Sequence, residues 1–284
     1  MLKRPTLSRI GFMQGRLSPL RNGQIQSFPW ENWRTEFEIA RSLDFHLMEW
    51  TLDQHQIMKN PLMTLGGRNE ILSLTESFQI EIPSLTGDCF MQAPFWKKKG
   101  LQRDCLLKDF RNVVNACFET GIGLIIIPLV DNGSLKNSRQ EFDLVACLIE
   151  MRSFFLERKM RVVFESDYSA PELMRFISHL EPEIFGINYD IGNSAALGFD
   201  AQEEISTYGE RIMNVHIKDR LLGGNTVPLG SGAADFSRVF QCLSEIGYDG
   251  NYILQTARAS DANHAGVLER YQKMALSWIE QYAA

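Results

Sequence analysis

The sequence predicts a single (β/α)8 barrel, and two features carry this prediction. Short β-rich apolar runs recur at regular intervals along 284 residues, a length typical of one barrel domain. The segments between these runs place apolar residues at helical spacing. An open doubly wound sheet is the alternative, but no G-x-G-x-x-G motif follows the first run. We therefore expect residues 1–284 to form one α/β domain built as a barrel.

The eight expected strands are short and rich in β-branched or aromatic residues, as strands usually are. In chain order they are Ser8–Met13, Phe45–Trp50, Ile80–Thr86, Leu124–Leu129, Arg161–Glu165, Phe185–Asp190, Arg211–Ile217 and Asn251–Gln255.

Helices are expected between these strands, on several local signals. Apolar residues recur at helical spacing from Cys105 to Phe118 and from Phe142 to Phe155. Pro171 suits the first turn of a helix, and Gly247 suits the end of one. The segments Arg21–Phe28 and Leu52–Gly67 lack such spacing, and we expect both to be long loops over the barrel mouth.

The composition excludes several classes of protein. The net charge is -6 and the charges are interspersed, which argues against a nucleic-acid partner. The five cysteines form no C-x-x-C pair, as expected in a reducing compartment. The first residues lack the apolar segment of a signal peptide, and no apolar run reaches about 18 residues. We expect a cytoplasmic protein with no membrane partner.

Three consecutive expected strands end on residues that bind metals. Strand five ends on Glu165, strand six on Asp190, and strand seven delivers His216. The carboxyl ends of barrel strands meet at one mouth, where barrel enzymes build their active sites. Two carboxylates and one imidazole suit one divalent ion such as Mn, Co, Mg or Zn. Without a metal, the same trio would form a general acid/base cluster.

Other polar residues at the expected mouth are candidates for substrate contacts or proton transfer. Lys218, Arg220 and Arg258 carry charges that suit a phosphate or carboxylate. The glycines at 223–224 and 230–232 either offer backbone N–H groups to a phosphate or only permit tight turns, with Asp219 paired to Arg220. The remaining candidates for substrate binding are Gln14, Arg16, Asp167 and Asn193.

The stretches around these residues resemble the xylose-isomerase-like barrels that include sugar-phosphate isomerases and epimerases. The resemblance rests on Val162–Glu165, Asn188–Asn193, Val215–Arg220 and Val227–Phe236, and is closest to ketose and ketose-phosphate 3-epimerases. It implies that Glu165, Asp190 and His216 bind the metal and that Glu165 moves the substrate proton. It further implies a small sugar or sugar-phosphate substrate and a homodimer, because family relatives often pair through their helices.

One position departs from the family pattern. The epimerases of this family use a glutamate on strand eight as fourth ligand and second acid/base group, and here that position holds Gln255. An amide oxygen coordinates hard cations but carries no titratable proton. Three outcomes are open. Glu165 alone catalyses aldose–ketose isomerisation; or Glu49, Asp88 or Asp167 replaces the missing glutamate; or the protein binds a sugar without proton transfer.

Two further activities belong to relatives of this barrel. A keto-inositol-type dehydratase would use the same metal for loss of water. Cleavage at abasic DNA sites needs a three-metal cluster with several histidines at strand ends, and only His216 occupies such a place. The sequence therefore favours a metal-dependent sugar isomerase or epimerase.

Overall fold

The computed structural model describes residues 5–21, 23 and 26–282. Eight parallel strands close into a barrel in the order β1-β10-β7-β6-β5-β4-β3-β2, which confirms the predicted fold. The strands are β1 (Ile10–Met13), β2 (Leu47–Thr51), β3 (Glu81–Thr86), β4 (Leu124–Leu129), β5 (Arg161–Ser166), β6 (Phe185–Asp190), β7 (Ile212–Ile217) and β10 (Asn251–Leu254). Outside the barrel, β8 (Asp219–Arg220) and β9 (Thr226–Val227) pair as an antiparallel ribbon.

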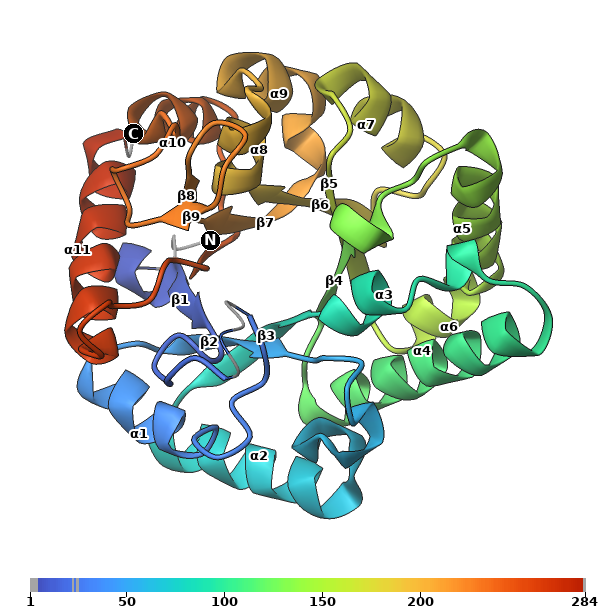
Figure 1. The fold of residues 1–284 in the computed structure, drawn as a ribbon, viewed down its shortest axis with the longest axis horizontal. Coiled ribbons are helices and arrows are strands. Elements are labelled where there is room, and N and C mark those ends of the chain that lie inside the picture. The colour runs from blue at the N-terminus through green and yellow to red at the C-terminus, as the bar shows by residue number, and fades with distance from the viewer. Residues whose placement is uncertain (1–4, 22, 24–25, 283–284) are drawn as a thin grey trace.

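Helices surround the strands in a ring, as Figure 1 shows. In chain order they are α1 (Thr35–Ser42), α2 (Leu65–Phe78), α3 (Asp88–Gln92), α4 (Gly100–Thr120), α5 (Ser138–Glu150), α6 (Arg152–Glu157), α7 (Ala170–Ile177), α8 (Ile191–Leu197), α9 (Ala201–Tyr208), α10 (Phe236–Glu245) and α11 (His264–Tyr282). Short 3-10 helices are η1 (Thr6–Arg9), η2 (Ile57–Lys59), η3 (Pro61–Met63), η4 (Phe95–Lys97), η5 (Asp131–Gly133) and η6 (Gly209–Arg211).

Two local expectations need correction. The segment Leu52–Gly67 is not a long loop, because η2, η3 and the first turn of α2 occupy much of it. Asn60 and Thr64 explain the difference, since each accepts a backbone N–H bond as a cap at the start of η3 or α2. The first expected strand also starts too early, because η1 occupies residues up to Arg9. In the other expected loop, residues 22, 24 and 25 lie outside the described residues.

The interior of the barrel is apolar at one depth and polar at another. Leu124, Ile126 and Val163 form a small apolar cluster inside the barrel, separate from the large core that contains most other buried apolar residues. Nearer the carboxyl ends, buried polar residues replace them, including Glu49, Asn188, Asn214 and His216. Each of these side chains makes at least one hydrogen bond, as burial in a low-dielectric interior favours.

Strand register brings the candidate ligands to one rim. Asp190 of β6 lies opposite His216 of β7, and Glu165 of β5 lies opposite Pro128 of β4. Side chains alternate along a strand, so Asn188 shares a face with Asp190, and Asn214 shares a face with His216. The fold therefore stacks an amide layer directly beneath the candidate ligands.

Candidate functional site

Glu165, Asp190 and His216 converge as the sequence predicts. Each offers a ligand atom that lies within 4.8 Å of the other two, and all three residues are buried. His216 Nδ1 is 3.3 Å from Glu165 Oε2 and 3.8 Å from Asp190 Oδ2. Ligand bonds of about 2.0–2.2 Å place neighbouring donor atoms about 3–4 Å apart around one ion. The donor set and its spacing therefore fit a single divalent cation.

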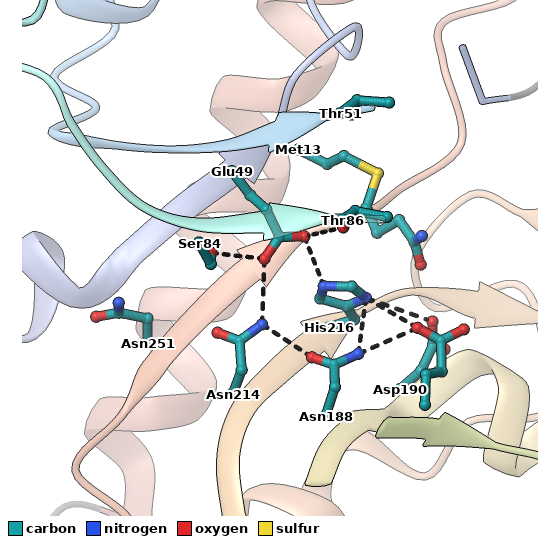
Figure 2. A network of polar contacts seen from close by, with 12 residues as sticks. Met13, Glu49, Thr51, Ser84, Thr86, Asn188, Asp190, Asn214, His216 and Asn251 are labelled. Atoms are coloured by element: carbon teal, nitrogen blue, oxygen red, sulfur yellow. Dashed lines mark hydrogen bonds and ion pairs between the residues drawn. The ribbon is translucent and has the colours of Figure 1, made fainter. Parts of the chain in front are cut away.

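A buried hydrogen bond fixes the ring of His216. Its Nε2 lies 2.7 Å from Glu49 Oε1, and both side chains are fully buried. Glu49 also accepts hydrogen bonds from Ser84 Oγ, Thr86 Oγ1 and Asn214 Nδ2. Figure 2 shows the imidazole between Glu49 on one side and Asn188 and Asp190 on the other. This arrangement directs Nδ1 toward the two candidate carboxylate ligands, as in carboxylate–histidine–metal triads.

The protonation equilibria at the three ligands reflect their mutual charges. Burial would lower the pKa of His216, but the charges and hydrogen bonds of Glu49 and Glu165 raise it to about 10. Burial raises the pKa of Asp190, although the charge of Lys218 opposes it. Burial would also raise the pKa of Glu165, but contacts with His216 and Lys218 outweigh it and lower that pKa. Positive charge at this point therefore stabilises the carboxylates, which is what a cation site requires.

A cavity of about 400 Å³ opens beside Glu165, one of the three candidate ligands. Glu165, Lys218 and Gln255 line it on one side, and Thr86 and Asp88 line it on the β3 side. Lys218 Nζ donates to Asp190 Oδ2 at 3.0 Å and to Gln255 Oε1 at 3.1 Å. The cavity volume and polar wall suit a small polar molecule such as a sugar.

Asn193, Asp167 and Arg220 also line the cavity, as expected of substrate-binding residues. Asn193 Nδ2 donates to Glu165 Oε1, and Arg220 donates to Asn193 Oδ1 at 2.8 Å. Asp167 accepts a hydrogen bond of 2.6 Å from Ser134. These contacts connect Arg220 to Glu165 through one amide.

Three predicted substrate-binding residues lie elsewhere. Gln14, Arg16 and Arg258 are absent from the described residues that line the cavity. Gln14 Oε1 accepts from Thr51 N, while Arg258 Nε donates to the carbonyls of Gly15 and Ser18. Arg16 is buried, and burial together with the charge of Arg258 lowers its pKa to about 9. In the structure these side chains support the segment after β1.

Glu49, expected at the rim, lies deeper than predicted. Strand β2 continues to Thr51, and the Glu49 carboxylate is beneath the cavity, bonded to His216. Through this hydrogen bond Glu49 orients His216, the candidate ligand. No local pattern in the sequence marks this depth, because the contact between Glu49 of β2 and His216 of β7 joins strands that are not neighbours in the barrel.

The glycine-rich segment does not offer free amides to a phosphate. The N–H groups of Gly230 and Gly232 donate to Asp219 Oδ2, while Gly223 and Gly224 donate to backbone carbonyls. Asp219 is also an acceptor for Ala234 N, so it holds the loop instead of pairing with Arg220. The glycines permit these turns; Gly223 and Gly230 both have positive φ.

Gln26 and Asn188 are functional candidates that the sequence reasoning missed. Asn188 Nδ2 lies 3.1 Å from both Glu165 Oε2 and His216 Nδ1, two residues before Asp190 on the same face of β6. Strand alternation could have identified it. Gln26 lines the cavity from the segment after β1, where no periodic pattern marks it.

Comparison with known proteins agrees with this geometry. Residues 37–281 match the family described as xylose isomerase-like TIM barrel. The chain belongs to this family. It is 24% identical over 262 residues to L-ribulose-5-phosphate 3-epimerase UlaE of Salmonella paratyphi A, covering 88% of this chain and 89% of the relative.

Solved structures share the fold of this family member at low sequence identity. The zinc-bound IolI protein superposes with a TM-score of 0.77 at 13% identity, covering 97% of this chain and 99% of that one. An L-ribulose 3-epimerase superposes with a TM-score of 0.73 at 12% identity, covering 97% of this chain and 95% of that one.

Among the described residues, no helix is both long and apolar enough to cross a membrane.

We predict that Asp219→Ala lowers the free energy of unfolding by about 2–3 kcal/mol, because three backbone donors lose a buried acceptor. Asp200→Ala is the matched control, since that exposed carboxylate caps α9 through one backbone N–H and its loss costs about 1 kcal/mol. Urea denaturation measures both. Equal losses in the two variants would contradict the assignment of Asp219 as the residue that holds this loop.

Proposed function

We propose that the protein is a divalent-metal-dependent epimerase of a ketose or ketose phosphate, acting on the carbon next to the carbonyl. The observation that carries this proposal is the convergence of Glu165, Asp190 and His216 beside a polar cavity of sugar size. The names of the curated relatives, 3-epimerases of a ketose phosphate, support the substrate class. The structure gives less support to a phosphate group on the substrate, because the N–H groups of Gly230 and Gly232 donate to Asp219.

We assign the cation to Glu165, Asp190 and the Nδ1 atom of His216. When bound, a divalent ion supplies a Lewis acid that polarises a carbonyl oxygen and stabilises a neighbouring enediolate. Gln255 belongs to the cavity wall in this assignment, because its Oε1 accepts from Lys218 and its Nε2 donates to Gln26. This differs from the expectation that Gln255 is a fourth ligand.

Glu165 is the proposed base of the reaction. It lines the cavity, and Asn188 and Asn193 hold its two oxygens. These two amides orient the carboxylate toward the cavity and restrict its rotation. A carboxylate that is positioned in this way removes a proton next to a carbonyl, with the electron pair delocalised into the carbonyl as an enediolate. Lys218 and Arg220 are the proposed contacts for substrate oxygens.

The first test of this function is exchange of a substrate proton with solvent. Metal-replete protein incubated in deuterated water with L-ribulose 5-phosphate, or with the unphosphorylated ketose, should incorporate deuterium at C3. Glu165→Gln should lower this exchange by about 10²–10⁴-fold, because the amide accepts no proton. Mass spectrometry and proton NMR measure the label. Ketose binding without any exchange would instead support a non-catalytic sugar-binding barrel.

The second test concerns Glu49 and metal affinity. We predict that Glu49→Gln weakens binding of Mn²⁺ or Zn²⁺ by about 10–100-fold, because the hydrogen bond that orients His216 loses its charge. Glu36→Gln is the matched control: Glu36 is also fully buried, but it accepts from Gly15, Leu17 and Ser18. Competition with a chelator of known affinity measures both variants. Equal affinities in the two would refute the role of Glu49.

A further inference from the structure

We propose that Asp88 is the second proton-transfer group, in place of an acid at Gln255. This inference rests on the proposed function and adds a second catalytic residue to it. Epimerisation needs one group to remove a proton from one face of a carbon and another to return a proton to the opposite face. Gln255 has no titratable proton, so a second group must come from another wall of the cavity.

Asp88 and Glu165 line the same cavity from different strands. Asp88 is the first residue of α3, directly after β3, whereas Glu165 lies in β5. Strand β4 separates these strands in the barrel, and its Pro128 lines the cavity. Gly87 permits the tight turn, since a Cβ there would lie 2.8 Å from Ile126 O and closer still to the Phe90 ring. The turn keeps the Asp88 carboxylate at the cavity wall.

A chain of amides links Asp88 to the position of the missing acid. Gln26 Nε2 donates to Asp88 Oδ2 at 2.6 Å, and Gln26 Oε1 accepts from Gln255 Nε2 at 2.9 Å. The three side chains come from the segment after β1, the β3 end and the β10 end. The side-chain amide of Gln26 therefore bridges Gln255 and the carboxylate of Asp88. Gln26 is a positioning residue in this arrangement.

The other carboxylates of the cavity wall fit the role less well. Among the described lining residues they are Asp131 and Asp167, besides Glu165. Asp131 is exposed, and half-buried Asp167 accepts from Ser134. Asp88 is only 4% exposed, so a bound substrate would leave little water in contact with its carboxyl group. Glu49 is bonded to His216 beneath the cavity.

The charges around Asp88 favour a residue that both gives and takes a proton near neutral pH. Burial and the negative charges of Asp53 and Glu165 raise the pKa of Asp88 to about 7, against the opposing effects of Gln26 and Arg16. A general acid is most effective when its pKa lies near the working pH. This electrostatic environment agrees with the geometric assignment.

Two proton transfers make up the proposed step. The Glu165 carboxylate takes the proton from the carbon next to the carbonyl, and the electron pair of that C–H bond forms the enediolate. Protonated Asp88 then donates its proton to the opposite face of the same carbon, and the carbonyl re-forms. Glu165 ends protonated and Asp88 ends as a carboxylate. Exchange with water returns both groups to their starting states, so no oxidant or reductant is needed.

The test follows each half of the reaction separately in metal-replete protein. L-ribulose 5-phosphate and its C3 epimer L-xylulose 5-phosphate are incubated in deuterated water with wild type, Asp88→Asn and Asp235→Asn. Wild type should exchange the C3 proton of both and interconvert them. Asp88→Asn should lose interconversion by about 10²–10⁴-fold and lose exchange from one epimer only, since Glu165 still deprotonates the other. Asp235→Asn makes the same charge change at the N-cap of α10 and should match wild type.

The alternatives give distinct results. Equal loss of exchange from both epimers in Asp88→Asn would show a structural role, and unchanged interconversion would exclude Asp88 from proton transfer. Absence of exchange in wild type with either epimer would overturn the proposed function and this assignment together.

The double variant Asp88→Asn/Gln255→Glu provides a second measurement. It should regain interconversion, because a carboxylate then returns to the β10 side; failure to regain any, in protein that still exchanges one epimer, would contradict the proposal.

Discussion

The hydrogen bond between Glu49 and His216 is the contact on which the candidate site depends. Both side chains are fully buried inside the barrel, where an unpaired charge is costly. Removing one partner of such a buried pair typically costs about 3–5 kcal/mol. Ser84 and Thr86 of β3 and Asn214 of β7 also donate to Glu49, so the carboxylate is held from two other strands. Its fixed position directs one nitrogen of His216 toward Glu165 and Asp190.

The two sides of the cavity are built from different parts of the barrel. Strands β5, β6 and β7 supply the three ligands, and the amides of Asn188 and Asn193 connect them. The opposite side combines β3, β10 and the segment after β1 through Gln26. Gln255 contacts both sides, because its Nε2 donates to Gln26 and its Oε1 accepts from Lys218, which also donates to Asp190. In the proposed function the three candidate ligands are those expected of the family, and only the second acid comes from a different position.

Much of this architecture was predictable from the sequence, because the signals are local. Apolar runs such as Leu124–Leu129 identified the strands, and residues at the ends of consecutive strands identified Glu165, Asp190 and His216. In a closed parallel barrel those ends meet at one mouth whatever the details of packing. The order of strands was therefore enough to bring the three ligands together.

The rest could not be read from local pattern. Gln26 meets Gln255 across 229 positions of sequence, from a segment without periodicity. The glycines at 230 and 232 suggested N–H groups for a phosphate, but these groups donate to Asp219. This contact depends on how the loop folds. Arg16 and Arg258 have the charge expected of substrate contacts, yet burial and packing near Glu36 place them outside the cavity wall. Non-local contacts decided each of these cases.

The most direct measurement of the central claim is anomalous X-ray diffraction from crystals of the protein soaked in Mn²⁺. The account predicts one strong anomalous peak at the mouth, about 2.0–2.2 Å from Glu165, Asp190 and the Nδ1 atom of His216, with Glu49 still bonded to Nε2. A peak bonded to Nε2, or no peak among these three residues at saturating Mn²⁺, would contradict it.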